Sequence, residues 1–253
     1  MFPRPCEYIR ADSVAEALGA LAADAEAKPI AGGQSLVPMM SLGLATPTSL
    51  VDITRLELCG LSRENGTVTV GALTTHRELE RGAQAGKLLP LAAEAARHIG
   101  NARVRNRGTF GGSLSHADPA AELGAVVLAQ GGRAVIEGPE GTRHVDFDEF
   151  FEGFFETAVR PGELLVAADL DATPPGAGTA FAEVARRTDD FALAAAAAVV
   201  TLRGAGELNS LRVALAGVAD RPVRCDAVER AYIGAQRSNE LLVGIARDRR
   251  AHV

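Results

Sequence analysis

The sequence predicts a mixed helix-and-sheet protein in two parts: an α/β part up to about Asp171, and behind it a smaller α+β part with antiparallel strands and terminal helices. In the first part, short β-like runs alternate with helix start signals. The segment Thr173–Gly178 contains Pro-Pro-Gly and marks the boundary. Beyond it, two long β-like runs at residues 194–203 and 211–217 flank a glycine-rich hairpin turn.

Local signals place the elements of the first part. Ser13–Glu16 and Thr75–Glu78 both have the spacing of a capping box, so a helix is expected to start after each of them. Asp118-Pro119 is typical of an N-cap followed by a first helical residue, which predicts a helix to about Gln130. Further helices are expected at residues 88–99, 146–155, 226–233 and 238–250, and further strands at residues 28–31, 50–53, 67–71, 133–137 and 164–170.

The composition excludes several classes of function. The 253 residues carry a net charge of −6 and only 4% aromatic residues with no Trp, so neither a basic patch nor base-stacking side chains favour nucleic-acid binding. No apolar run reaches the length of a membrane span, and the N-terminus lacks an apolar signal core, so a cytoplasmic protein is expected. Cys6, Cys59 and Cys225 are far apart, and the histidines show no ligand spacing, so no metal site is predicted.

A pair of similar glycine turns is the most informative feature. The first is Ala31-Gly32-Gly33-Gln34-Ser35-Leu36, and the second is Thr109-Phe110-Gly111-Gly112-Ser113-Leu114. Each is expected to follow a short strand. Glycines let backbone N–H groups approach an anion without a Cβ in the way, and a following helix adds its positive end. Two such turns predict a site that holds a diphosphate from two sides.

Both turns differ from the common nucleotide-binding signatures. The sequence contains neither G-x-G-x-x-G nor G-x-x-x-x-G-K-[ST], which argues against a Rossmann dinucleotide site and against ATP hydrolysis of the P-loop kind.

The turns resemble a known family. Ala31–Leu36 resembles the first flavin-diphosphate loop of the FAD-binding medium subunit of molybdenum hydroxylases, the group that includes the carbon monoxide dehydrogenase and xanthine dehydrogenase families. Arg105–Ser113, followed by Asp118–Glu122, resembles the second loop. Further agreement, in order along nearly the whole chain, comes from Gly71–Thr75, Pro161–Leu165, Glu183–Arg187 and Asp190–Ala192.

The resemblance implies a fold and a domain division. The expected class is α+β: a two-subdomain FAD-binding fold of the vanillyl-alcohol-oxidase type, followed by a small α/β C-terminal domain with an antiparallel sheet. Residues 1–172 would form the FAD-binding domain, with subdomains at about 1–56 and 57–172. Residues 177–253 would form the C-terminal flavoprotein domain, which is shorter here than the family pattern leads us to expect.

The resemblance also implies the site. Residues of the two turns would wrap the diphosphate, Glu122 would hydrogen-bond FAD, Leu165 would line the site, and Phe191 would offer a stacking face to the isoalloxazine. The residues assigned to cofactor binding are Ile30, Ala31, Gly32, Gly33, Gln34, Ser35, Leu36, Thr109, Phe110, Gly111, Gly112, Ser113, Glu122, Leu165 and Phe191. His116 would either touch FAD or lie in an exposed loop.

Some positions depart from the family pattern. Gln34 stands where His is common, Ser113 where Asn is common, and Glu122 where Asp is usual. Ala182 or Glu183 occupies a position where relatives often have Lys near the flavin.

The resemblance implies an electron-transfer subunit with FAD as its cofactor and no catalytic residue that touches an organic substrate. Electrons would come from 2Fe-2S clusters on a small iron–sulfur subunit, while a large molybdopterin subunit oxidises the substrate, in a dimer of heterotrimers. The acceptor would be NAD, a quinone, oxygen or another molecule. The alternative is a free-standing FAD-dependent oxidoreductase of the same fold that acts directly on a small molecule.

Overall fold

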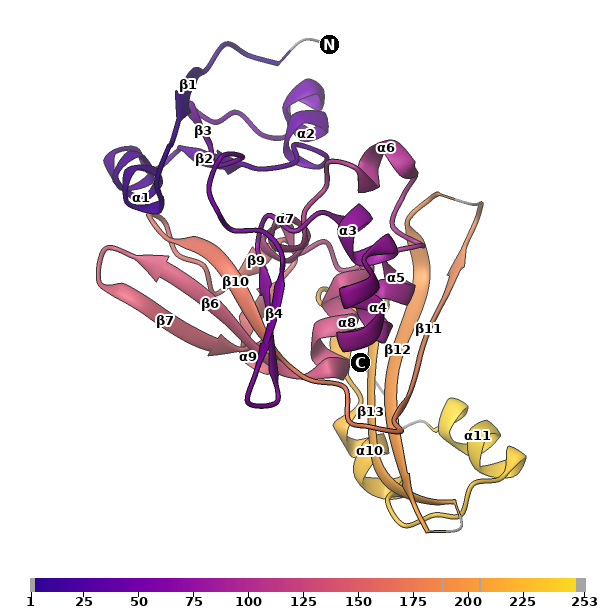
Figure 1. The fold of residues 1–253 in the computed structure, drawn as a ribbon. Coiled ribbons are helices and arrows are strands. Elements are labelled where there is room, and N and C mark those ends of the chain that lie inside the picture. Colours follow the sequence, from indigo (N-terminus) through magenta and orange to yellow (C-terminus); the bar gives the residue numbers. More distant parts are fainter. Residues whose placement is uncertain (1–2, 188, 205, 249–253) are drawn as a thin grey trace.

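The computed structural model describes residues 3–187, 189–204 and 206–248. Two β-sheets stand on either side of a layer of helices, and a small N-terminal unit sits above them (Figure 1). This mixed arrangement, with an antiparallel C-terminal sheet, confirms the predicted fold class. In the described part of the chain, no helix has both the length and the apolar character needed to cross a membrane.

The N-terminal unit is a three-stranded parallel sheet in the order β1-β3-β2, with one helix after each of its first two strands. The Ser13 side chain accepts a hydrogen bond from Glu16 N, so the first expected cap is present. The bounds are β1 Glu7–Arg10, α1 Val14–Ala23, β2 Lys28–Ile30, α2 Leu36–Leu42 and β3 Ser49–Asp52.

The central unit contains a five-stranded antiparallel sheet in the order β4-β5-β10-β6-β7. Its strands are β4 Leu61–Glu64, β5 Thr67–Gly71, β6 Gly132–Gly138, β7 Gly141–Asp146 and β10 Leu164–Asp171, and β8 Phe151–Gly153 pairs separately with β9 Glu156–Thr157. Its helices are α3 His76–Arg81, α4 Ala83–Leu88, α5 Pro90–Ala95, α6 Ala102–Arg105, α7 Phe110–His116, α8 Glu122–Gln130 and α9 Phe147–Phe150.

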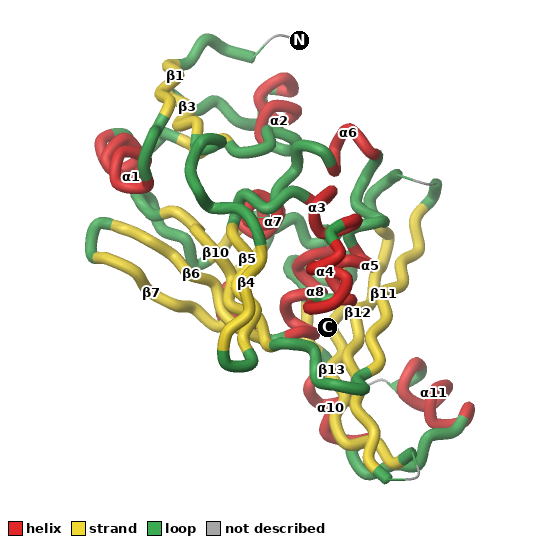
Figure 2. The backbone as a smooth tube through the Cα atoms, in the orientation of Figure 1, coloured by secondary structure: helices red, strands yellow, loops and turns green. Residues whose placement is uncertain are grey.

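The C-terminal unit is an antiparallel sheet in the order β11-β12-β13-β14 (Figure 2). The two predicted long strands are present, whereas β11 and β14 had no strong sequence signal. The bounds are β11 Gly178–Ala185, β12 Ala192–Arg203, β13 Glu207–Ala216, β14 Val223–Arg224, α10 Asp226–Tyr232 and α11 Asn239–Ala246. Residues 249 and 250, at the end of the last predicted helix, lie outside the described residues.

Helix α8 packs between the central and C-terminal units and contacts both. All of its residues are buried, because it packs against β12 and β13 as well as against α5 and α7. An apolar helix with no polar face is stable only when it is covered on all sides. The largest core cluster accordingly contains Leu123 and Val126 from α8 together with Phe181, Ala195 and Ala214 from the C-terminal sheet.

Three predicted elements were wrong in extent. The helix expected at Asp118-Pro119 begins only at Glu122, because the Asp118 carboxylate accepts a hydrogen bond from Ala120 N and holds a turn instead. The helix expected at 88–99 is divided, with α4 ending at Leu88 and α5 starting at Pro90. Of residues 146–155, only α9 is helical, and Phe154 is exposed at the tip of the β8–β9 hairpin.

Candidate cofactor-binding site

The first glycine turn connects β2 to α2. Gly33 has φ +68°, a left-handed conformation that most L-residues adopt only with strain. The Gln34 amide donates to Gly32 O at 3.0 Å, which fixes the shape of the turn. Ser35 is the residue before α2, and its hydroxyl makes no cap hydrogen bond to that helix.

Backbone donors in this turn are available to a ligand. Within the described residues, the N–H groups of Gly32, Gly33, Gln34 and Ser35 reach no hydrogen-bond acceptor. Consecutive unpaired N–H groups in a tight turn form an anion-binding concavity, and α2 starts directly after it. The first turn therefore offers the donor set that a diphosphate needs.

The second turn is the first turn of α7, and the strand expected before it is absent. The preceding segment is α6 and a loop, and Thr109 forms only a single bridge with Thr75. Thr109 is the N-cap of α7, with Oγ1 accepting from Gly112 N at 3.1 Å. The N–H groups of Phe110 and Gly111 donate to Thr74 O and Ala72 O, both at 2.8 Å. This turn thus offers the positive end of α7 and the Ser113 hydroxyl, which has no partner among the described residues.

The first turn touches Arg107 and Gly108, the two residues that lead directly into the second turn, through backbone atoms, and this is the contact between the two turns. A Cβ on Gly32 would lie 2.0 Å from Arg107 O and 2.9 Å from Gly108 Cα. A Cβ on Gly111 would lie 2.5 Å from Ala72 Cβ. No side chain fits at either position: glycine is required at Gly32, where the first turn meets the segment before the second turn, and at Gly111, where α7 meets the residue after β5. The structure therefore places Gly32 of the first turn against the Arg107-Gly108 segment that leads into the second turn.

Glu122 lies in the first turn of α8 and is 7% exposed. Burial raises the pKa of its carboxyl to about 7, and the nearby carboxylates of Glu183 and Asp118 act in the same direction. At neutral pH this group is therefore protonated in a large fraction of molecules, and it can donate a hydrogen bond as well as accept one.

Glu183 faces the same region from β11. Its Oε1 lies 3.4 Å from His98 Nδ1, and its Oε2 is buried without a partner among the described residues. The His98 ring packs on Phe181 with a centroid distance of 5.3 Å. These contacts connect the central unit to the C-terminal sheet. Sequence reasoning assigned no role to His98, because its partner is distant in sequence.

The other predicted residues are dispersed. Leu165 is 3% exposed on β10, in the core against which α7 packs. Phe191 precedes β12 and is 64% exposed. Figure 1 shows that the β11–β12 connection is at the end of the C-terminal sheet nearest α6. His116 is half-buried, and its ring stacks on Phe155 at a centroid distance of 5.0 Å.

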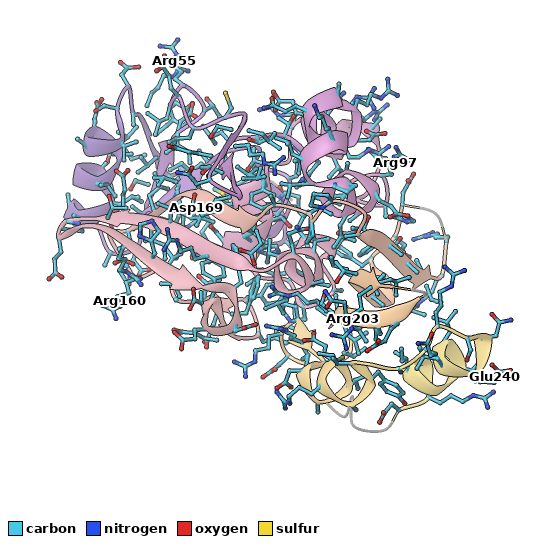
Figure 3. All side chains as sticks on the ribbon, turned by 60° about the horizontal axis from the view of Figure 1, so that its bottom comes forward. Arg55, Arg97, Arg160, Asp169, Arg203 and Glu240 are labelled. Atoms are coloured by element: carbon cyan, nitrogen blue, oxygen red, sulfur yellow. The ribbon has the colours of Figure 1, made fainter. Side chains whose placement is uncertain are left out.

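Two cavities lie away from the turns. One of about 430 Å³ is lined by acidic and basic side chains that include Asp169, Asp171 and Arg212. Figure 3 labels Asp169 on the central sheet, and Arg133 and His144 both approach its carboxylate. The other, of about 470 Å³, lies beside Arg221 and Arg224. Across the described ranges, no group of three His, Cys, Asp or Glu side chains is placed to hold a metal ion.

Comparison with known proteins decides the family. A model described as the FAD binding domain in molybdopterin dehydrogenase matches residues 4–170, and a model described as the CO dehydrogenase flavoprotein C-terminal domain matches residues 179–253. The chain belongs to the FAD-binding medium subunits of the molybdenum hydroxylases. Its identity as an FAD-binding oxidoreductase subunit confirms the expectation that the family resemblance implied.

Individual relatives in this medium-subunit family resemble the chain along most of its length. It is 38% identical to the 6-hydroxypseudooxynicotine dehydrogenase complex subunit alpha of Paenarthrobacter nicotinovorans, over 97% of this chain and 84% of the relative. It is also 38% identical to the carbon monoxide dehydrogenase medium chain of Hydrogenophaga pseudoflava, over 97% and 86%.

Solved structures of the same family share the fold. The carbon monoxide dehydrogenase structure from Hydrogenophaga pseudoflava superposes with a TM-score of 0.94 at 38% identity, covering 97% of this chain and 86% of that one. Quinoline 2-oxidoreductase from Pseudomonas putida 86 gives a TM-score of 0.92 at 32% identity, covering 99% and 87%.

Proposed function

We propose that this medium subunit is an electron-transfer flavoprotein that takes electrons from 2Fe-2S clusters of a partner subunit and passes them to NAD, a quinone, oxygen or another acceptor. Bound FAD would supply the redox chemistry, since flavins exchange electrons that protein side chains cannot. The observation that carries the proposal is the backbone contact between the two glycine turns, with unpaired N–H groups at the first turn.

The chain's own residues would bind and orient the cofactor. The N–H groups of Gly32–Ser35 would donate to the diphosphate, and the positive ends of α2 and α7 favour its negative charge. The Ser113 hydroxyl is free to donate to the same group. We assign Glu122, Leu165 and Phe191 to the remainder of the site, with Glu122 as a carboxyl that can donate or accept a hydrogen bond.

The names of the relatives support partner subunits. One relative is a subunit of a dehydrogenase complex, and others are called medium chains of carbon monoxide dehydrogenase. We propose that a small iron–sulfur subunit and a large molybdopterin subunit complete the enzyme as a dimer of heterotrimers in the cytoplasm. We also propose that residues 1–172 and 177–253 are its two domains, because the segment between them lies in the connection from β10 to β11.

The first experiment is a visible absorption spectrum of the purified chain after incubation with FAD and gel filtration. We expect flavin bands at one FAD per chain. A chain that stays free of flavin after this treatment would contradict the proposal and also its alternative, the free-standing oxidase.

The second experiment separates these two functions. The neighbouring reading frames are searched for a small cysteine-rich protein and a large protein, the chain is co-expressed with those found, and it is purified through an affinity tag. We expect the three chains to elute together and the flavin to be reduced only when the complex receives substrate. A flavin-loaded chain that elutes alone and turns over a small molecule without partners would favour the free-standing enzyme.

A further inference from the structure

His76 lies directly beneath the contact between the two turns. It is the first residue of α3 and is 4% exposed. A Cβ on Gly108 would lie 2.7 Å from His76 Cδ2 and 2.9 Å from Nε2, so the ring is packed against the Gly108 backbone. Gly108 in turn lies against Gly32 of the first turn. The His76 ring therefore supports the Gly108 backbone, and the Gly108 backbone in turn touches the backbone of the first turn.

Backbone hydrogen bonds hold the ring at this position. His76 N donates to Gly108 O at 3.0 Å, and Phe110 N donates to Thr74 O. Thr75 and Glu78 form the capping box that fixes the start of α3. The segment that carries the ring is thus tied to the second turn on one side and to its own helix on the other.

A second side chain of α3 supports the same segment. Glu80 is four residues after His76, so both lie on one face of the helix. Its Oε2 accepts from Arg105 Nε at 3.1 Å, and Arg105 also donates to Ile99 O at 3.0 Å. The loop that leads to the second turn is therefore anchored at Arg105 and again at Gly108.

The His76 ring is neutral, and among the described residues neither of its nitrogens has a hydrogen-bond partner. Burial, assisted by the Arg105 charge, lowers the pKa of His76 to about 4. Its Nδ1 is buried without a partner within the described ranges. A buried polar atom with no partner opposes folding, so hydrogen bonding by the ring does not explain its place in the core. What the ring supplies is volume under Gly108.

We propose that His76 is a positioning residue for the cofactor diphosphate. Its ring fixes the position of the Gly108 backbone and thereby the contact of the second turn with the first. This contact fixes where the free N–H groups of the first turn lie relative to the second turn. This inference rests on the proposed function, since it concerns the same cofactor site.

A double-mutant cycle tests the packing contact in the full chain. Gly108→Ala places a methyl group against the ring, and we expect it to weaken FAD binding about tenfold, equivalent to about 1.4 kcal/mol. His76→Ala removes the support and is expected to weaken binding to a similar extent. In the double variant the new methyl group no longer meets the ring, and of the three atoms nearest to it only Val104 O remains, at 3.0 Å. The double variant should therefore bind FAD at least about threefold better than additivity of the two single variants predicts.

Three readouts distinguish positioning from general destabilisation. The FAD dissociation constant is measured by flavin fluorescence, the phosphorus NMR resonances report the bound diphosphate, and thermal unfolding reports stability. His76→Phe keeps a planar ring, so it should restore near-normal affinity and resonances. His144→Ala, a histidine on β7 whose side chain is 40% exposed, is the matched control and should change neither.

The outcomes are separable. Single variants that fold and bind FAD with unchanged affinity and resonances would overturn the role of His76, while FAD binding by the wild type would leave the proposed function standing. Strictly additive losses in the cycle would also overturn it. If His76→Ala does not fold, the other two variants test the proposal by themselves. Normal FAD affinity in Gly108→Ala would then contradict it, and so would weak FAD binding by a folded His76→Phe. A wild-type chain that binds no FAD contradicts the proposed function itself.

Discussion

The two glycine turns look alike in sequence but are built differently. The first is a true turn, with a left-handed Gly33 and backbone donors left unpaired. The second is the start of a helix, and the N–H groups of Phe110, Gly111 and Gly112 are already bonded within the protein. On the proposed assignment the first turn supplies free backbone donors to the anion, while backbone N–H groups of the second turn hold it against Thr74 and Ala72. Two similar patterns, Gly-Gly followed by Ser one or two residues later, thus serve two physical purposes, and substitutions can separate them.

The largest effect is expected at the contact between the turns. In Gly32→Ala, the new methyl group overlaps Arg107 O, so the turns must move apart. Overpacking against backbone costs about 3 kcal/mol, which corresponds to roughly 100-fold weaker FAD binding. Fluorescence titration of the apoprotein measures this. The control is Gly86→Ala on α4, where a methyl group meets nothing within 4 Å and should leave affinity unchanged. Equal affinity for both variants would refute the contact.

A pH effect of similar size on the free energy of unfolding is expected from His76, which lies against Gly108 just before the second turn. The His76 pKa is lowered to about 4 from 6.5, so between these values the unfolded chain binds a proton that the folded chain does not. The free energy of unfolding should therefore fall as pH falls from about 6.5 towards 4, by up to about 3 kcal/mol from this residue. Urea denaturation of the wild type and of His76→Phe across this range measures the difference. Parallel pH profiles would show that His76 titrates normally.

A smaller effect is expected from the conformation of the first turn. Gly33→Ala forces an L-residue to φ +68°, which costs about 1–2 kcal/mol, and places its Cβ 3.2 Å from Val37 Cγ2, a side-chain atom that can shift slightly. We expect FAD binding to weaken about tenfold. Asn tolerates this conformation better than Ala, so Gly33→Asn should retain more affinity. The FAD dissociation constants of the two variants, measured at one temperature, test this expectation. A greater loss of affinity in Gly33→Asn than in Gly33→Ala would contradict the explanation by backbone conformation.

The smallest effect on the cofactor is expected at the equivalent glycine of the second turn. A Cβ on Gly112 would lie 2.7 Å from Thr109 Oγ1 and near no other group beyond that side chain. Gly112→Ala should therefore disturb the Thr109 cap at a cost of about 1 kcal/mol in stability. FAD affinity should change by less than about threefold, because this N–H is already used within the protein. A loss as large as that of Gly32→Ala would mean that the Gly112 N–H group itself binds the anion and not only Thr109 Oγ1.

The sequence revealed the pair of turns but not their difference. Local patterns identify Ser13 and Thr75 as caps, because both signals lie within one helical turn. They fail at Asp118, where a side-chain hydrogen bond to Ala120 holds a turn, and before Thr109, where the backbone is held by residues distant in sequence. The role of His76 depends on tertiary contact with Gly108, and no spacing rule contains that information.

Strand β10 belongs to two cores at once. Leu164 and Val166 pack in the cluster of the N-terminal unit, while Leu165, Ala168 and Leu170 pack in the large cluster with α8. A register shift between Leu165 and Ala167 allows this change of face. Opening either core therefore removes support from the other, so the N-terminal and central units are expected to unfold as one cooperative block. Amide hydrogens of β3 and α8 should then exchange with the same free energy of opening, although no hydrogen bond connects these two elements.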